Sequence, residues 1–197
     1  MQSNSSSATA VAGLTQAELA LASLYLEQTQ TLMIGAIRGL SEAQWNFRTP
    51  GSWSIAEIAT HVAFIQELVL ARLRENLPSA PAGPDGRDAA VIDGIILRHF
   101  PLRLVKFPAP EFAIPKGGGK LGDEIERITA NTRALATILE STPDLRAHVL
   151  ESPPLKVVTQ GEHTLADGYQ WILTVSAHTE RHAKQIVEMR ADPRFPN

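Results

Sequence analysis

The stretch DGYQWILTVSAHTERHAKQIVEM, residues 167–189, indicates the fold class because its apolar and histidine positions recur at the spacing of one helix face. Residues three and four apart lie on the same side of an α-helix. We therefore expect a long helix that begins after Thr164 and runs to about Ala191, where DPRFP stops it. Its inward face is predicted to carry Trp171, Val175, His178, His182, Gln185 and Met189.

Three earlier segments repeat this periodicity, and two of them open with a capping box. In a capping box, the side chains of two residues three apart satisfy backbone N–H groups at the start of a helix. Thr15 with Glu18 and Ser54 with Glu57 fit this pattern. The expected helices span about 16–40, 54–77 and 121–142. Four such segments predict an all-α fold, an elaborated four-helix bundle.

Residues 78–119 form an expected Pro/Gly-rich insertion between the second and third long helices. They hold seven of the thirteen prolines and six of the thirteen glycines. One short helix is predicted at about 88–100, and the glycines of the run KGGGK, residues 116–120, are expected to form a flexible joint. A second irregular stretch is expected at 142–163, without strand pairs. We expect residues 1–13 to be a disordered lead-in and residues 14–197 to form a single domain.

Composition narrows the classes of function. The net charge of −3 and the scattered basic residues argue against binding to nucleic acid or to an anionic membrane. No run approaches the roughly 20 apolar residues of a membrane span, and no secretory signal is recognisable. Cysteine is absent, so disulfides, thiolate ligands and a cysteine nucleophile are excluded. We expect a cytoplasmic protein with a small-molecule partner.

His178 and His182 lie four residues apart, so their imidazoles can point to one place. Two nitrogens are too few for a durable metal site, and His61, on the predicted inward face of the second long helix, is the natural third ligand. Imidazole suits zinc, nickel, copper or ferrous iron. Two alternatives remain open: six histidines in 197 residues give such a pair by chance fairly often, and the three rings can simply be hydrogen-bonded in the core.

The sequence HTERH differs from the helical zinc motifs of peptidases. Its glutamate is the third residue of five, whereas HExxH and HxxEH place it second or fourth. Glu180 is therefore expected to face away from the histidines. Three protein ligands leave a metal position open, which is typical of catalytic or ligand-binding sites and not of closed structural zinc sites.

Other residues have plainer interpretations. Gln185, three residues after His182, is a candidate hydrogen-bond partner of a metal ligand or of a bound water. Packing around a helix start is the expected role of Trp45 and Trp53, and a place in the core that of Tyr169 and Trp171. The remaining histidines, predicted to be exposed, are His99, His148 and His163.

Two stretches resemble the DinB/YfiT-like superfamily of small helical metal-binding proteins: TPGSWSIAEIATHVAFIQELV at 49–69 and DGYQWILTVSAHTERHAKQIVEM at 167–189. The resemblance implies a four-helix bundle of unusual connectivity that is often a homodimer. It implies a divalent metal, most often zinc or nickel, held by His61, His178 and His182, and it also covers Gln185. Characterised members include thiol S-transferases and a thiol-dependent maleylpyruvate isomerase, whereas the insertion at 78–119 departs from the simplest members.

These features lead to two hypotheses of function. The first is a metal-dependent enzyme, S-transferase-like or hydrolase-like, that acts on a small electrophilic substrate. Without a cysteine of its own, an S-transferase needs a low-molecular-weight thiol as cosubstrate. The second is a non-catalytic, stress-related dimer that binds a metal or another small ligand.

Overall fold

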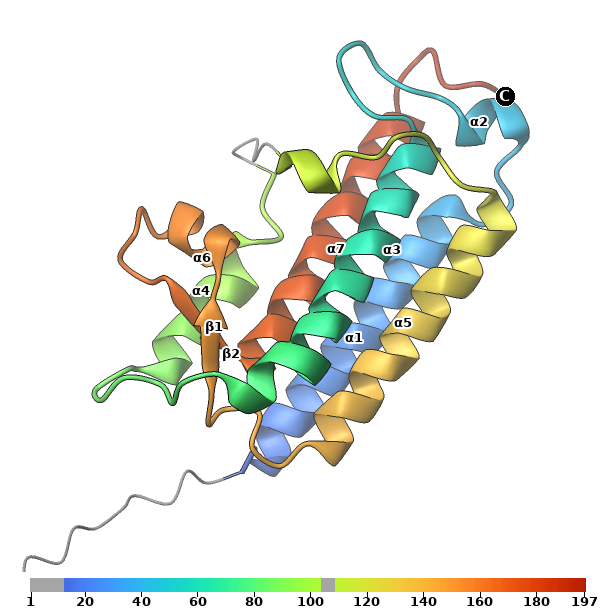
Figure 1. The fold of residues 1–197 in the computed structure, drawn as a ribbon. Coiled ribbons are helices and arrows are strands. Elements are labelled where there is room, and N and C mark those ends of the chain that lie inside the picture. Colours follow the sequence, from blue (N-terminus) through green and yellow to red (C-terminus); the bar gives the residue numbers. More distant parts are fainter. Residues whose placement is uncertain (1–12, 104–108) are drawn as a thin grey trace, which may run out of the picture.

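The computed structural model describes residues 13–103 and 109–197 and is mostly helical, as the sequence predicts. Four long helices lie side by side (Figure 1). They are α1 (Gln16–Ile37), α3 (Ile55–Ala71), α5 (Leu121–Ser141) and α7 (Gly168–Arg190). Helix α1 packs against α7 and α5, and α3 packs against the same two helices from the other side. The histidine-bearing helices α3 and α7 are therefore neighbours.

The predicted capping boxes are present and set the starts of two long helices. The Thr15 and Ser54 hydroxyls accept hydrogen bonds from the backbone N–H groups of Glu18 and Glu57, whose carboxylates bond back to the cap residues. The same device begins the short helix α2 (Glu42–Trp45), which the periodicity did not predict because one turn shows no period. Local chemistry thus fixes where α1 and α3 begin.

The predicted ends of the first two long helices were less accurate. Helix α1 stops at Ile37, before Gly39 in a left-handed conformation at φ +74°, and not at Leu40. The α-helical part of α3 ends at Ala71. The chain then forms a wider π-helical turn, η1 (Arg72–Asn76), and a short 3₁₀ turn, η2 (Leu77–Ser79). Proline at position 78 ends the helical path there because it has no N–H to donate.

The insertion contains the predicted short helix, α4 (Ala89–His99), which packs against α7. A 3₁₀ turn, η3 (Glu111–Ala113), follows the undescribed residues 104–108 and contacts α3. A flexible joint was expected at the glycine run, but two of its glycines, Gly118 and Gly119, lie in close contact with other parts of the chain. A Cβ on Gly118 would lie 2.2 Å from the Cβ of Ala56, and the Gly119 N–H donates to the Thr60 hydroxyl at 2.9 Å. Glycine is needed here because the backbone approaches α3.

The prediction of an irregular stretch at 142–163 was wrong. Strand β1 (Val149–Glu151) pairs antiparallel with β2 (Leu165–Asp167), and helix α6 (Pro153–Val158) lies between them. Helix α7 consequently starts at Gly168, where Asp167 and Gln170 form a capping box, and not directly after Thr164. Each strand has three residues, too few for alternation to reveal.

A charged network, which the sequence did not reveal, ties this small sheet to α1, α4 and α7. Arg146 bonds to Glu18 at 2.5 Å, to Asp93 at 2.6 Å and to Asp167 at 3.1 Å. Arg87 bonds to Asp167 at 3.1 Å and to the amide oxygen of Gln170. We call Glu18, Arg87, Asp93, Arg146 and Asp167 the charged network. It joins four segments that are distant in sequence at the amino-terminal end of α7.

Burial and charge act against each other within this network. Burial raises the pKa of Asp167 above its ordinary value, although the Arg146 and Arg87 guanidinium groups act to lower it. Burial acts to lower the pKa of Arg146, but the neighbouring carboxylates raise it overall. The carboxylates and guanidinium groups thus stabilise each other's charged forms, and their burial costs free energy because they lose hydration.

Candidate metal centre

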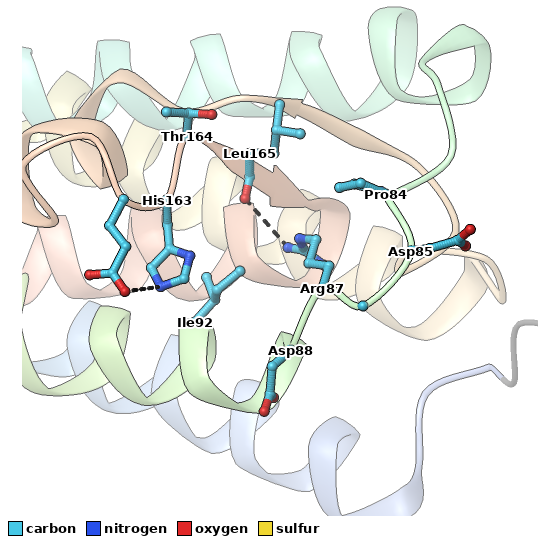
Figure 2. A pocket seen from close by; sticks show the side chains of 10 residues that line it. Pro84, Asp85, Arg87, Asp88, Ile92, His163, Thr164 and Leu165 are labelled. Atoms are coloured by element: carbon cyan, nitrogen blue, oxygen red, sulfur yellow. Dashed lines mark hydrogen bonds and ion pairs between the residues drawn. The ribbon is translucent and has the colours of Figure 1, made fainter.

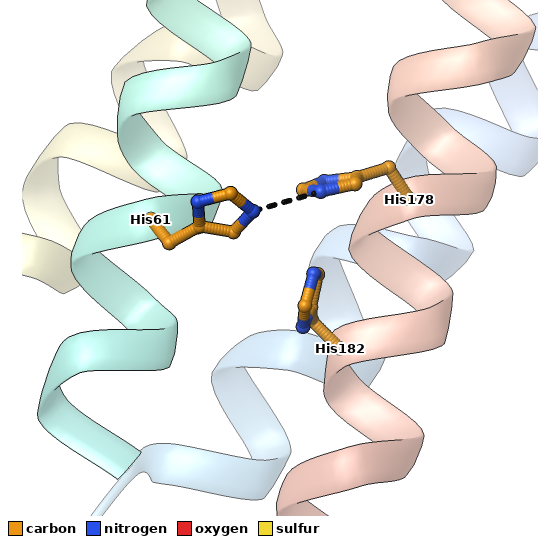
Figure 3. Close-up of side chains that lie close together, drawn as sticks. All are labelled: His61, His178 and His182. Carbon is orange, nitrogen blue, oxygen red and sulfur yellow. Dashed lines mark hydrogen bonds between the residues drawn. The ribbon is translucent and has the colours of Figure 1, made fainter. Parts of the chain in front are cut away.

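Three histidines from two helices meet in one place, as the sequence predicted (Figure 3). His61 projects from the second turn of α3, and His178 and His182 project from the middle of α7. The Nε2 atoms of His61 and His178 are 3.1 Å apart, and one nitrogen from each of the three rings lies within 4.8 Å of the others. We call these residues the histidine cluster.

The rings of His61 and His182 are each oriented by a hydrogen bond between Nδ1 and an oxygen atom. The Nδ1 of His61 donates to the Ala113 carbonyl oxygen in η3 at 2.8 Å, because that oxygen can only accept. The Nδ1 of His182 bonds to the amide oxygen of Gln185 at 2.9 Å. When Nδ1 carries the proton, Nε2 keeps its lone pair. The Nε2 atoms of His61 and His182 are therefore available as ligands.

The third ring, His178, has an unsatisfied atom. Its Nδ1 is buried without a hydrogen-bond partner in the part of the chain that the structure describes. Its Nε2 faces the lone pair of His61 Nε2, so in the absence of a metal it holds the proton and leaves Nδ1 as a bare acceptor. A buried polar atom without a partner costs about 1–3 kcal/mol. The cluster therefore does not satisfy itself by hydrogen bonding.

All three imidazoles favour the neutral state. Burial lowers the pKa of His61, and burial together with the nearby His182, His61 and Arg181 lowers that of His178 well below its ordinary value. Burial, reinforced by His61, lowers the pKa of His182 to about 3. A neutral imidazole is the form that binds a metal. The ligand atoms are thus ready near neutral pH without first losing a proton.

The spacing of the nitrogens fits a small divalent ion. Zinc–nitrogen bonds of about 2.0–2.1 Å in a tetrahedron place neighbouring nitrogens about 3.3 Å apart. The His61–His178 separation of 3.1 Å is close to this value, and the upper limit of 4.8 Å for the set is within reach of small side-chain rotations. The ligands are all neutral nitrogen, so an ion held here keeps its full positive charge. The residues therefore fit a divalent metal with at least one open position.

Of the residues around the cluster, some take the roles that the sequence predicted and one was missed. Trp53 packs its ring on that of His61, with 4.8 Å between centroids, so its packing role extends to a candidate ligand. Trp45 is buried and donates its indole N–H to the Gly119 carbonyl oxygen. Glu180 accepts from the Tyr25 hydroxyl at 2.6 Å and so faces α1, as expected. The Ala113 carbonyl oxygen was missed because a backbone atom leaves no mark in the sequence.

The other three histidines lie away from the cluster. His99 is exposed at the end of α4, as predicted. His148 and His163 are half-buried, contrary to prediction. The Nδ1 of His148 bonds to the Ala80 carbonyl oxygen at 2.6 Å, which accounts for its burial.

A pocket of about 400 Å³ lies elsewhere, between residues 84–92 and 162–165 (Figure 2). Its walls carry Asp85, Asp88 and Glu162, and Arg87 faces it from the charged network. None of the three clustered histidines lines it. The case for a functional site therefore rests on the chemistry of the histidine cluster and not on this pocket.

Comparison with known proteins connects the cluster to a family. No curated protein and no solved structure matches the chain. None of the helices that the structure describes is long and apolar enough to cross a membrane. The family model described as the DinB superfamily matches residues 25–186, a stretch that contains all three clustered histidines. By this match over most of its length, the chain belongs to the DinB superfamily.

Proposed function

We propose that the protein is a divalent-metal-dependent enzyme whose metal is held by His61, His178 and His182. The observation that carries the proposal is the unsatisfied state of His178 between two rings whose Nε2 lone pairs are already directed inward. A divalent ion at this position would accept a lone pair from one nitrogen of each ring. The proton that His178 Nε2 shares with His61 Nε2 would then no longer be needed. We propose zinc or nickel because both suit neutral imidazole.

The chemistry that a bound divalent ion supplies is a lowered pKa for a bound water or thiol, which makes a nucleophile available near neutral pH. The chain's own residues prepare the site. The Ala113 carbonyl and Gln185 hold two rings in the ligand tautomer, and the Trp53 ring packs against that of His61 at a tilt of 54°. The proposed reaction is attack on a small electrophilic substrate, either thiol S-transferase-like or hydrolase-like.

The S-transferase reaction requires a thiol from solution because the chain has no cysteine. We propose a low-molecular-weight thiol as the cosubstrate. The absence of cysteine also fits a protein of the reducing cytoplasm, which is the location that we propose. We propose that the four long helices are the four-helix bundle of the family and that residues 78–119 are an insertion between its second and third helices.

The second candidate function is binding without catalysis. His61 is held by the Trp53 ring and by the Ala113 carbonyl in η3. Such contacts also suit a protein in which a metal or small ligand only stabilises the helices. Such a protein would gain stability from the metal but would not turn over any substrate.

Metal analysis tests the premise shared by both functions. We expect about one zinc or nickel ion per purified, loaded chain, and loss of that ion in His61→Ala and His178→Ala. His99→Ala, at an exposed histidine outside the cluster, is the matched control and should keep the ion. A wild-type protein that takes up neither metal rules out the site.

Turnover separates the two functions. Consumption of a low-molecular-weight thiol together with an electrophile, or hydrolysis of the electrophile alone, should occur in the loaded wild type and be lost in both cluster variants. Metal-dependent thermal stabilisation without either reaction would support the binding protein instead.

A further inference from the structure

Beside the histidine cluster, α7 carries charged residues that are not candidate metal ligands. Arg181 is three residues after His178 and directly precedes His182. Glu188 follows Arg181 by seven residues, so the two lie on the same side of the helix, about 10.5 Å apart along its axis. Arg103, from the insertion, reaches this side, since its Nε donates to both carboxylate oxygens of Glu188 at 2.9 Å. We call Arg103 and Arg181 the arginine pair.

The guanidinium groups of the arginine pair act electrostatically on the histidine rings. After burial, which is the main cause in each ring, Arg181 acts to lower the pKa of both His178 and His182. Arg103 acts in the same direction on His182. Burial and Arg103 also lower the pKa of Arg181, and the Glu188 carboxylate opposes them. Because such interactions weaken with distance, the arginine pair lies beside the place where the rings converge.

Positive charge is in excess on this side of the cluster. The two guanidinium groups and the one carboxylate of Glu188 give this set a net charge of +1. The clustered imidazoles favour the neutral state, so they would leave the charge of a divalent ion uncompensated. Clustered positive charge attracts anions, and guanidinium groups bind carboxylates through charge-assisted hydrogen bonds. A carboxylate suits this side, and that of Glu188 already docks on Arg103.

This charged side is accessible to a ligand. The side chain of Arg103 is 27% exposed and that of Glu188 is 60% exposed. Arg181 and the two histidines of α7 are half-buried. An ion pair as exposed as that of Arg103 and Glu188 contributes little, because water and salt screen it. An incoming carboxylate can therefore replace Glu188 on Arg103 at small cost.

We propose that Arg103 and Arg181 form an anion subsite beside the metal centre, where they hold the carboxylate of a small molecule whose other end reaches the metal. The subsite rests on the metal centre of the proposed function and narrows the ligand to a small organic acid. Either reactant, the electrophile or the thiol cosubstrate, can supply the carboxylate. In both cases the arginine pair orients one end of the molecule while the reacting atom lies at the histidine cluster.

Calorimetric titration of the zinc-loaded full chain tests the subsite without requiring turnover. Propionate and propionamide are the matched probes for an electrophile, and mercaptoacetate and mercaptoacetamide are the matched probes for a thiol. We expect the wild type to bind the carboxylate of at least one probe pair about 10-fold more tightly than the corresponding amide. The probe pair that shows this preference identifies the reactant that carries the carboxylate.

Substitutions of the charged residues test whether the arginines cause the preference. Arg103→Gln and Arg181→Gln should each weaken carboxylate binding about 10-fold and leave amide binding unchanged, since each removes a charge-assisted hydrogen bond. Glu188→Gln should instead strengthen carboxylate binding about 2- to 5-fold, because a competing carboxylate is gone. Arg133→Gln, at an exposed position of α5, is the matched control and should bind as the wild type does.

Zinc content and helix content, measured on every variant, should equal those of the wild type, which excludes loss of the metal site or of the fold as the cause. A carboxylate bound only by direct ligation to zinc would keep its affinity in both arginine variants, and this result overturns the subsite. Equal binding of carboxylate and amide in both probe pairs also overturns it. Arginine-dependent carboxylate binding without any turnover would support the subsite and contradict the proposed enzyme, so each can fail without the other.

Discussion

The charged network and the histidine cluster both place polar groups beside α7, about 16 Å or more apart along the helix, but they are satisfied in opposite ways. In the network, two guanidinium groups are matched by three carboxylates, and Asp167 is fully buried between Arg87 and Arg146. In the cluster the rings favour the neutral state, and the Nδ1 of His178 is buried without a partner in the part of the chain that the structure describes. The network pairs its charges within the chain, although the Nε of Arg87 is buried without a hydrogen-bond partner among the described residues, whereas the cluster brings together neutral nitrogens that have no charge to pair.

This difference separates two uses of buried polarity. A network that is closed by its own side chains contributes to the position of the elements that it joins. A set of converging, neutral and incompletely bonded nitrogens is instead suited to binding. Mutations in the two regions should accordingly change different measured quantities.

The largest effect is expected from breaking the network at Arg146. Arg146→Met removes the cation paired with Asp93 and one of the two paired with Asp167, and breaking a buried ion pair by removing one partner costs about 3–5 kcal/mol. We expect the free energy of unfolding in urea to fall by about 3 kcal/mol. Arg133→Met, at an exposed position of α5, should change it by less than about 0.5 kcal/mol. Equal effects of the two substitutions would show that the network does not hold the fold.

A smaller effect, on a different quantity, is expected at Gln185. Gln185→Leu removes the oxygen that orients His182, and loss of such an outer partner typically weakens metal affinity 10- to 100-fold, about 1.4–2.7 kcal/mol. A competition titration with a zinc chelator measures the change. Gln185→Glu keeps an oxygen acceptor and should retain most of the affinity. If both variants bind zinc as the wild type does, Gln185 does not position the ligand.

The smallest effect is expected from Glu18, and it depends on pH. Burial would raise the pKa of Glu18, but hydrogen bonds from Thr15 and Arg146 outweigh it and lower this pKa below 4.5. An acid with a lowered folded-state pKa stabilises the fold above its unfolded-state pKa, and this contribution is lost as pH falls through the folded-state pKa.

Glu18→Gln should therefore be less stable than the wild type at pH 7, by at most about 1 kcal/mol because the pair is partly exposed. Glutamine can still serve in the capping box, so the substitution mainly tests the charge. Urea unfolding at pH 7 and at pH 3–4 should show the difference shrinking as the acid is protonated. A difference that is unchanged at low pH would contradict an electrostatic origin.

The sequence predicted those parts of the molecule that depend on local or periodic signals. The Thr15 and Ser54 caps and the spacing of His178 and His182 are visible within a few residues. The charged network was not predictable, because Arg146 meets Glu18 across 128 positions of the chain. Strands β1 and β2 were missed for a related reason: their pairing depends on the packing of segments that the sequence does not show to be neighbours.

The bond between His61 and the Ala113 carbonyl has a consequence for mutational scanning. The oxygen belongs to the main chain, so replacing the methyl group of residue 113 leaves the acceptor in place. A library of single side-chain changes would record position 113 as tolerant wherever the new side chain fits. The dependence of the imidazole on η3 becomes visible only when the peptide group itself is altered, as by an ester linkage or by shortening the loop.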